Sequence, residues 1–230
     1  MTLATLLLAD GRFPAGGHAH SGGVEAAVSD GRVHDIASLA AYVRGRLHTA
    51  GLTDAALAVA TARRLDPDGT ADPPRVVLRV LDAEADARML APPLRHASRR
   101  LGRQLVRVAS RCWASPIWAD VALAAPDGLH QACTWGVVGR VAGIDDGEVA
   151  RLAVHHAVST PAQAGVRLLG LDPFAVAGVL AAVQADGEAV ARRAVVAGRG
   201  ALHDLPAGTG PVVEIAAVEH ATWDMRMFTT

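Results

Sequence analysis

Two histidines, His18 and His20, stand one residue apart in a glycine-rich stretch and form the pair with the clearest chemical potential. Alternate side chains of an extended segment point to the same side, so both imidazoles could meet one metal ion, and imidazole suits nickel, copper and zinc. A third ligand would be needed, and Glu25, His220 or a partner's side chain are candidates. In the competing interpretation the two histidines only pack and hydrogen-bond. A helical metalloenzyme or metal-binding protein that uses His18 and His20 is therefore one hypothesis.

The sequence lacks the motifs that most often indicate catalysis. It contains no Gly-x-x-x-x-Gly-Lys-Ser/Thr phosphate loop, no Gly-x-Ser-x-Gly nucleophile turn, no Cys-x-x-Cys and no His-Glu-x-x-His. Ordinary catalysis needs positioned acids, bases or nucleophiles, and none stands out in a recognisable spacing. We therefore predict that the chain is not an enzyme.

Residues 10–23 must position the two histidines, and their composition describes a loop of specified shape. Five glycines and Pro14 fall between one short apolar segment and the next, which begins at Val24. Glycine reaches backbone angles that other residues avoid, and proline fixes one angle. Glu25 follows near a helix start, where the helix dipole favours a carboxylate, and it could equally belong to a docking face. Function often resides in such loops on a rigid scaffold.

The rest of the chain reads as one all-α domain, residues 1–230. Of the 230 residues 51% are apolar but only 3% are aromatic, so alanine, leucine and valine must build the core, which favours helix packed on helix. Periodicity and caps predict nine or ten helices in a single bundle. We expect Gly51 to end one helix, Pro161 to interrupt or kink a long one, and residues 199–230 to form a loosely structured tail. The predicted helices cover about residues 2–9, 23–29, 36–50, 53–65, 76–85, 94–113, 128–141, 147–169, 173–185 and 188–196.

Charge and cysteine content limit the partners and the compartment. The net charge is −1, from 22 basic and 23 acidic side chains, and phosphate binding needs a clustered basic surplus, so nucleic acid is not expected as a main partner. No run reaches the roughly 18 apolar residues of a membrane span, and no basic region precedes the first leucines. Two cysteines fit a reduced compartment. We therefore expect a cytoplasmic protein that does not engage a membrane.

One predicted helix carries a series of arginines. They occur between residues 95 and 107, mostly off the apolar side of the helix. Such a series is typical of a solvated face. It is equally consistent with a partner-binding face, because arginine makes forked contacts to carboxylates. The arginines are Arg95, Arg99, Arg100, Arg103 and Arg107.

Several separated motifs give the sequence a resemblance to a known family. The loop matches at Pro14, Gly16, Gly17, Ser21, Gly23 and Glu25, with His18 and His20 in two places that are usually aromatic. The middle of the chain matches at Arg95, Ser98, Gly102, Arg103, Leu105 and Arg167-Leu168. The end matches at Ile215-Ala216-Ala217, His220, Arg226 and Phe228. In this order and spacing the motifs resemble the UreF family of urease accessory proteins.

The resemblance implies a fold, a role and partners. Proteins of that family are all-α, form homodimers and are not catalytic. The resemblance implies that the chain binds a UreD/UreH-type accessory protein, that this pair recruits a UreG-type GTPase, and that the assembly delivers nickel to apo-urease. Nickel would be handled by the complex, and no cofactor is expected to be bound stably by this chain.

We further expect the loop and the tail to lie together and to shape the surface that recruits partners. In this hypothesis Arg226 pairs with His20 or Glu25. Two departures from the family bear on it: Ala221 stands in the place of a glutamate, and the chain ends in two threonines rather than in a polar, basic segment. The predicted partner-binding residues are Pro14, Gly16, Gly17, His20, Ser21, Gly23, Glu25, His220, Arg226 and Phe228.

Overall fold

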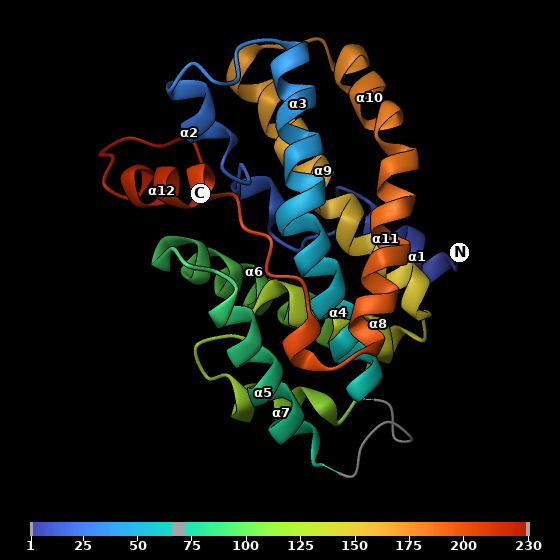
Figure 1. The fold of residues 1–230 in the computed structure, drawn as a ribbon. Helices are drawn as coiled ribbons and strands as arrows, with labels where there is room; N and C mark the ends of the chain where they lie inside the picture. The colour runs from blue at the N-terminus through green and yellow to red at the C-terminus, as the bar shows by residue number, and fades with distance from the viewer. Residues whose placement is uncertain (1, 66–71, 229–230) are drawn as a thin grey trace.

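The computed structural model describes residues 2–65 and 72–228, and these residues form helices and turns without a β-strand (Figure 1). The predicted all-α fold class is confirmed for this part of the chain. Residues 66–71, and residues 229–230 of the predicted tail, lie outside it. The α-helices are α1 (Leu3–Ala9), α2 (Val24–Ser29), α3 (Ile36–Arg46), α4 (Leu52–Arg64), α5 (Pro74–Ala87), α6 (Pro92–Cys112), α7 (Ile117–Ala124), α8 (Gln131–Ala142), α9 (Asp146–Leu169), α10 (Pro173–Ala182), α11 (Gln184–Arg199) and α12 (Pro211–His220).

The described residues thus form twelve α-helices, where the sequence predicted nine or ten. The difference comes from α7 and α12, which are absent from the predicted set. α12 lies within residues 199–230, so the prediction of a loosely structured tail is wrong for this segment. Pro211 stands at its first position, which favours a helix start, and the small side chains of Ala216 and Ala217 are buried where α12 packs against α2 and α6. Residues 221–228 are non-helical, as predicted.

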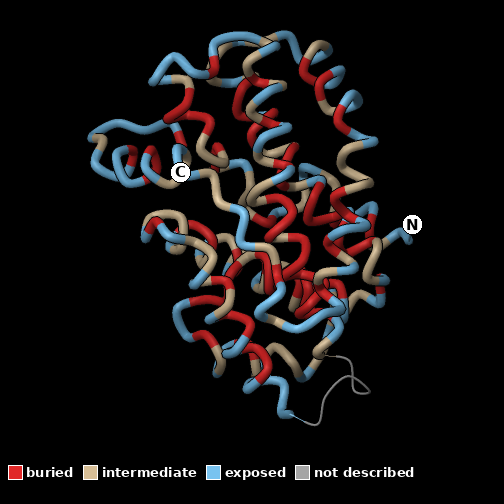
Figure 2. Tube along the Cα trace, in the orientation of Figure 1, coloured by how far each residue is buried: buried red, intermediate tan, exposed pale blue. Residues whose placement is uncertain are grey.

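α4 runs through the centre of the fold, where the buried residues are concentrated (Figure 2). Every residue from Leu52 to Ala62 except Asp54 is buried, and the helix packs against α8, α9 and α11. The helices approach closely because their side chains are small: a Cβ atom at Gly136 of α8 would lie 2.3 Å from the carbonyl oxygen of Ala58. Even alanine at position 136 would therefore push the two helices apart.

The prediction that Gly51 ends a helix is wrong. α3 continues through a π-helical turn, η2 (Leu47–Gly51), directly into α4. Gly51 has helical backbone angles, and a Cβ atom there would lie 3.3 Å from the Cβ atom of Ala157. The glycine therefore serves close packing against α9. π-Helical turns often occur at functional sites, and this one lines the cavity described below.

α9 is not interrupted at Pro161, although the sequence predicts an interruption or a kink there. Proline has no N–H group, which leaves the carbonyl of Ala157, four residues earlier, without its helical donor. Nε of Arg46 donates to that oxygen instead, at 3.2 Å. A side chain at the end of α3 thus replaces a main-chain hydrogen bond of α9, and the helix continues.

No single helix in the described ranges is both long and apolar enough to cross a bilayer. α10 and α11 meet that test only when they are taken together, and the chain bends by 48° between them. Each of the two helices also packs part of its apolar surface into the bundle, including Val176 and Val179 of α10 and Val190 and Ala194 of α11.

Candidate functional site

One hydroxyl and one tyrosine shape the Gly-rich loop. Oγ of Ser21 accepts hydrogen bonds from the N–H groups of Gly23 and Glu25, at 3.2 and 3.3 Å, at the start of α2. Gly23 has a φ of +88°, and a Cβ atom there would lie 2.7 Å from Oη of Tyr42. That hydroxyl donates to the carbonyl of Gly22 at 2.8 Å. The serine and the glycine of the predicted motif therefore have an internal role: they set the path of the backbone.

The loop and the tail meet at Glu25, in an arrangement that we call the tail clasp (Glu25, His220, Met227 and Phe228). Nε2 of His220 lies 2.8 Å from Oε2 of Glu25 and donates to it. The N–H groups of Met227 and Phe228 donate to the two oxygens of the same carboxylate, at 2.6 and 3.0 Å. Glu25 and His220 are both buried, so donors from the tail replace the water that the carboxylate loses. These bonds confirm that the two ends lie together.

A second contact between loop and tail passes through Arg167, near the end of α9. Its Nη1 donates to the carbonyl of His18 at 2.9 Å, and its guanidinium carbon lies 4.5 Å from the centroid of the Phe228 ring. A cation over an aromatic face is attracted to it. Arg167 is not among the predicted site residues, although it belongs to one of the matched motifs. On the other side of the loop, Nε2 of Gln104 in α6 donates to the carbonyl of Pro14 at 3.1 Å.

The predicted site residues differ widely in exposure. Arg226 is exposed and forms no hydrogen bond or ion pair with another described residue, so its predicted pairing with His20 or Glu25 is wrong. His220 and two main-chain N–H groups hold the Glu25 carboxylate instead. Two of these residues are exposed, Pro14 and Arg226. Three are partly buried: Gly16, Gly17 and Gly23. The other five are buried: His20, Ser21, Glu25, His220 and Phe228.

His20 lies inside the molecule rather than on its surface. Burial lowers the pKa of its imidazole to about 4, and the nearby charges of Arg100 and His18 act in the same direction. The ring is therefore neutral at physiological pH. Because it is buried, His20 supports the loop from within and contributes little exposed surface.

The metal hypothesis for His18 and His20 finds no third ligand in the structure. The two candidates, Glu25 and His220, are bonded to each other in the tail clasp. Within the described residues, a single group of side chains brings three possible ligand atoms within 4.8 Å of one another, and it does not include either loop histidine. The geometry therefore gives no support to a metal site at this pair.

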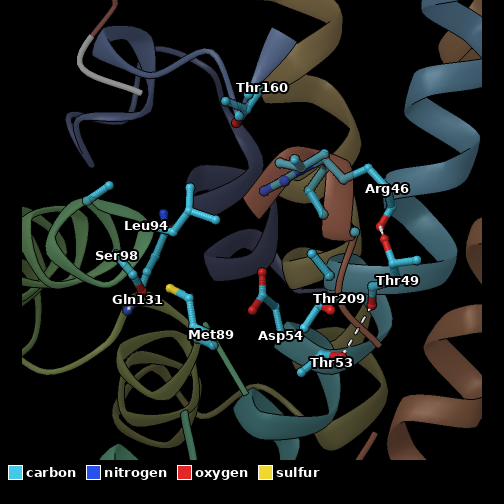
Figure 3. Close-up of a pocket in the computed structure, with 18 of the residues that line it drawn as sticks. Arg46, Thr49, Thr53, Asp54, Met89, Leu94, Ser98, Gln131, Thr160 and Thr209 are labelled. Atoms are coloured by element: carbon cyan, nitrogen blue, oxygen red, sulfur yellow. Dashed lines mark hydrogen bonds between the residues drawn. The ribbon is translucent and has the colours of Figure 1, made fainter. Parts of the chain in front are cut away.

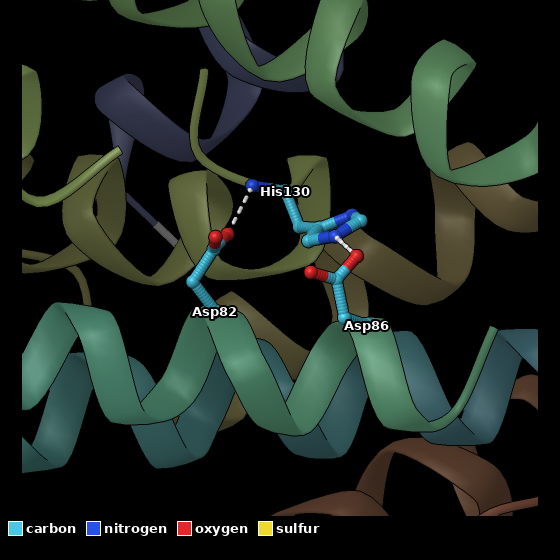
Figure 4. Close-up of side chains that lie close together, drawn as sticks. All are labelled: Asp82, Asp86 and His130. Atoms are coloured by element: carbon cyan, nitrogen blue, oxygen red, sulfur yellow. Dashed lines mark hydrogen bonds and ion pairs between the residues drawn. The ribbon is translucent and has the colours of Figure 1, made fainter. Parts of the chain in front are cut away.

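That group consists of Asp82 and Asp86 of α5 and His130 before α8 (Figure 4). Arg99 of α6 pairs with both carboxylates: its Nη1 lies 2.7 Å from Asp82 and its Nη2 lies 2.6 Å from Asp86. Nε2 of His130 lies 2.8 Å from Oδ1 of Asp86, and Nδ1 lies 3.0 Å from Oγ of Ser98. The guanidinium holds oxygens that a metal ion would use. We therefore interpret the group as an ion-pair network that joins α5, α6 and α8.

A cavity of about 380 Å³ reaches from the Gly-rich loop to α4 (Figure 3). The carboxylate of Asp54 points into it and accepts no hydrogen bond from a described residue. Burial raises the pKa of Asp54 to about 6, against the weaker opposing effect of Arg46. His156 also lines the cavity; it stacks on Trp135 with 4.5 Å between the ring centroids, and burial lowers its pKa to about 4. The volume is within the range of small-ligand sites, and the lining contains other charged side chains besides Asp54, including Arg46, Arg88 and Glu214.

Comparison with known proteins places these features in a family. A sequence model of the UreF family matches residues 33–184. A protein of Mycolicibacterium vanbaalenii named urease accessory protein UreF is 40% identical over 232 residues, which cover 99% of this chain and 98% of the relative. The chain belongs to the UreF family. Proteins of the same name from Mycobacterium sp. strain JLS and Mycobacterium tuberculosis are 42% and 38% identical, over 76% of this chain and 77% of each relative.

Membership of the UreF family confirms the resemblance inferred from the motifs. The relatives are accessory proteins of urease and not enzymes, so the prediction that this chain is not an enzyme is also confirmed. The structure gives the central motif a physical reason. Oγ of Ser98 accepts from the N–H group of Gln131 at 3.1 Å, and a Cβ atom at Gly102 would lie 1.8 Å from the carbonyl oxygen of Leu129. Both residues thus allow the start of α8 to pack closely against α6.

Proposed function

We propose that this member of the UreF family is a scaffold in the assembly of the urease nickel centre. In this proposal the chain binds a UreD/UreH-type accessory protein, and the pair recruits a UreG-type GTPase for the delivery of nickel to apo-urease. Family membership supports this setting. Nickel is then the cargo of the assembly and not a resident cofactor of this chain.

The observation that carries the proposal is the tail clasp. Its bonds hold the end of the tail against the Gly-rich loop, so that Met225, Arg226 and Met227 face outward. The exposed fractions of the two methionines are 88% and 65%. Exposed apolar side chains beside an arginine are typical of protein-binding surfaces. A backbone that is already fixed also lowers the entropy lost on binding, which favours the tail as a docking element.

Co-purification with the D- and G-type partners, scored by urease activation, tests the proposal. Arg226→Ala should reduce recovery of the assembly and of active urease. It should leave thermal unfolding unchanged, because this exposed side chain has no partner among the described residues. Arg193→Ala, which removes an exposed arginine from α11, is the matched control. Wild-type assembly by the Arg226 variant would exclude the tail as docking element, and failure of the wild-type chain to co-purify would refute the scaffold.

Two subsidiary expectations belong to the same proposal. The purified chain should be a homodimer by light scattering. Nickel titration should reveal no tight site in the isolated chain, because His18 and His20 have no third ligand within reach among the described residues. A tight site that His18→Ala abolishes would instead favour the metal-binding alternative.

A further inference from the structure

An open groove of about 510 Å³ lies between the Gly-rich loop and α6, outside the tail clasp. One wall is the 3-10 turn η1 (Gly17–Ala19), and the other is the exposed face of α6. His20 and Leu101 form part of the lining. The hydrogen bond from Gln104 to the carbonyl of Pro14 joins the two walls. The groove is therefore preformed and does not depend on a partner for its shape.

Three arginines of α6 give the groove its charge. Arg100, Arg103 and Arg107 line it, and all three are exposed. Among the described residues no carboxylate pairs with any of them, and Arg103 donates only to the main-chain oxygen of Asp127. The described lining contains no aspartate or glutamate. Arg99, on a neighbouring face of the same helix, behaves differently, because it is fully engaged with two carboxylates of α5.

The spacing of these charges favours a chain of anionic groups over a single anion. The three arginines occupy positions i, i+3 and i+7 of one helix, so at 1.5 Å per residue they extend over about 10 Å. One carboxylate or phosphate is too small to meet all three. Acidic side chains at alternate positions of an extended peptide, about 7 Å apart, would meet them in series. Nucleic acid fits less well, because the chain as a whole has a net charge of −1.

We propose that this basic groove receives an acidic segment of a partner protein, whose carboxylates pair with Arg100, Arg103 and Arg107. Guanidinium groups hold carboxylates in forked, charge-assisted pairs. The three unpaired charges also steer an acidic partner toward the Gly-rich loop, which forms one wall. The inference rests on the proposed function for its setting, a protein assembly. The preference for carboxylates is a property of this chain alone and can be measured without the assembly.

Fluorescence anisotropy with labelled octaglutamate and the purified full chain tests the groove. The wild-type chain should bind this peptide more tightly than labelled octaglutamine, and added salt should weaken the binding because the charges are exposed. The triple variant Arg100→Gln, Arg103→Gln, Arg107→Gln should bind about tenfold more weakly, which is the effect expected for the loss of three exposed ion pairs. Its thermal unfolding should fall only slightly, because none of the three has a carboxylate partner within the described residues and only the hydrogen bond from Arg103 to the carbonyl of Asp127 is lost.

A matched triple variant removes the same charge from exposed positions elsewhere: Arg75→Gln, Arg192→Gln and Arg193→Gln. It should bind octaglutamate as the wild type does. Equal weakening in both triple variants, or equal binding of octaglutamine, overturns the proposal. The proposal is also overturned if the wild-type chain binds a single-stranded oligonucleotide more tightly than octaglutamate and only the groove variant loses that binding. If the chain does not bind octaglutamate but still assembles with its partners, the groove proposal alone is refuted. If the chain binds octaglutamate but does not assemble, the scaffold proposal alone is refuted.

Discussion

Glu25 and Asp54 are two carboxylates of one molecule that the fold treats in opposite ways. Glu25 lies in the first turn of α2, where the helix dipole favours negative charge, whereas Asp54 lies within a continuous helix because α3 runs through η2 into α4. Glu25 accepts three hydrogen bonds from the tail. Asp54 accepts none from the described residues, and burial raises its pKa to about 6. The two carboxylates thus differ in their place along a helix and in the donors that tertiary structure supplies.

The position of those donors in the chain explains why Glu25 stabilises the fold and Asp54 does not. The groups that bond Glu25 come from about 200 residues further along the chain, so the tail clasp closes the fold on itself. A buried carboxylate with its donors in place holds distant segments together, and removing it leaves those donors unpaired. Asp54 faces a cavity with only the more distant charge of Arg46 to favour ionisation. It therefore lowers the stability of the ionised protein and leaves a polar group facing open volume.

The largest effect is expected for Glu25→Gln, a loss of about 3 kcal/mol in the free energy of unfolding. Glutamine keeps the shape, but it has one acceptor oxygen, and its NH₂ group would face an N–H group of the tail. Urea denaturation measures the loss. Glu219→Gln, on an exposed position of α12, is the control and should change stability by less than about 0.5 kcal/mol. Equal losses in both variants would show that the tail clasp contributes nothing specific.

Asp54→Asn should have the opposite sign and increase the free energy of unfolding by about 2 kcal/mol at neutral pH. The rise in pKa from 3.8 to about 6 sets an upper limit of about 3 kcal/mol, and water in the cavity reduces it. Asparagine has nearly the same size and no charge to desolvate. Asp224→Asn, in the exposed part of the tail, should leave stability unchanged. A destabilised Asp54 variant would contradict the view that this carboxylate lacks a compensating donor.

Acid titration sharpens the same comparison. Burial lowers the pKa of His20 and of His156 to about 4, so the stability they contribute is complete above their unfolded pKa of 6.5 and is lost as the pH falls toward 4. Asp54 has the opposite effect: as the pH falls from about 6 to 3.8, its protonation increases the free energy of unfolding and partly offsets the loss caused by the histidines. Asp54→Asn should therefore steepen the acid loss of stability by about 1 kcal/mol per pH unit. Unfolding measured between these pH values tests this, and parallel curves for the two proteins would contradict it.

Long periodic segments made much of the fold predictable. The helix predicted over about residues 94–113 is found as Pro92–Cys112, because its apolar side repeats over several turns. The expected helix end at Gly51 and the expected interruption at Pro161 are both absent where tertiary contacts intervene. Gly51 continues a helix because it packs against Ala157, and Pro161 stays within α9 because Arg46 supplies the missing donor. Neither contact has a signal in the sequence near those residues.

The candidate site was likewise predictable in part from the sequence. Motif order predicted that loop and tail lie together, which Glu25 and His220 confirm. The motifs did not reveal which tail residue makes the contact, because a pair separated by 195 positions leaves no local pattern. The predicted partner is Arg226, whereas the structure uses His220 and main-chain N–H groups, which every residue except proline carries. Asp54 was not predicted at all, since its perturbed pKa depends on burial that only the folded chain creates.

The smallest effect is expected at Arg167, the second link between loop and tail. Arg167→Lys keeps the charge but loses the planar group that both donates to the carbonyl of His18 and lies over the Phe228 ring. We expect a loss of about 1 kcal/mol in the free energy of unfolding, with Arg192→Lys at an exposed position of α11 as the neutral control. If the guanidinium stabilises the protein by its contact with the Phe228 ring, the double variant Arg167→Lys, Phe228→Leu should lose less free energy of unfolding than the two single variants lose in sum. Additive losses would separate the two groups and leave the Glu25 carboxylate as the one coupled link between the ends of the chain.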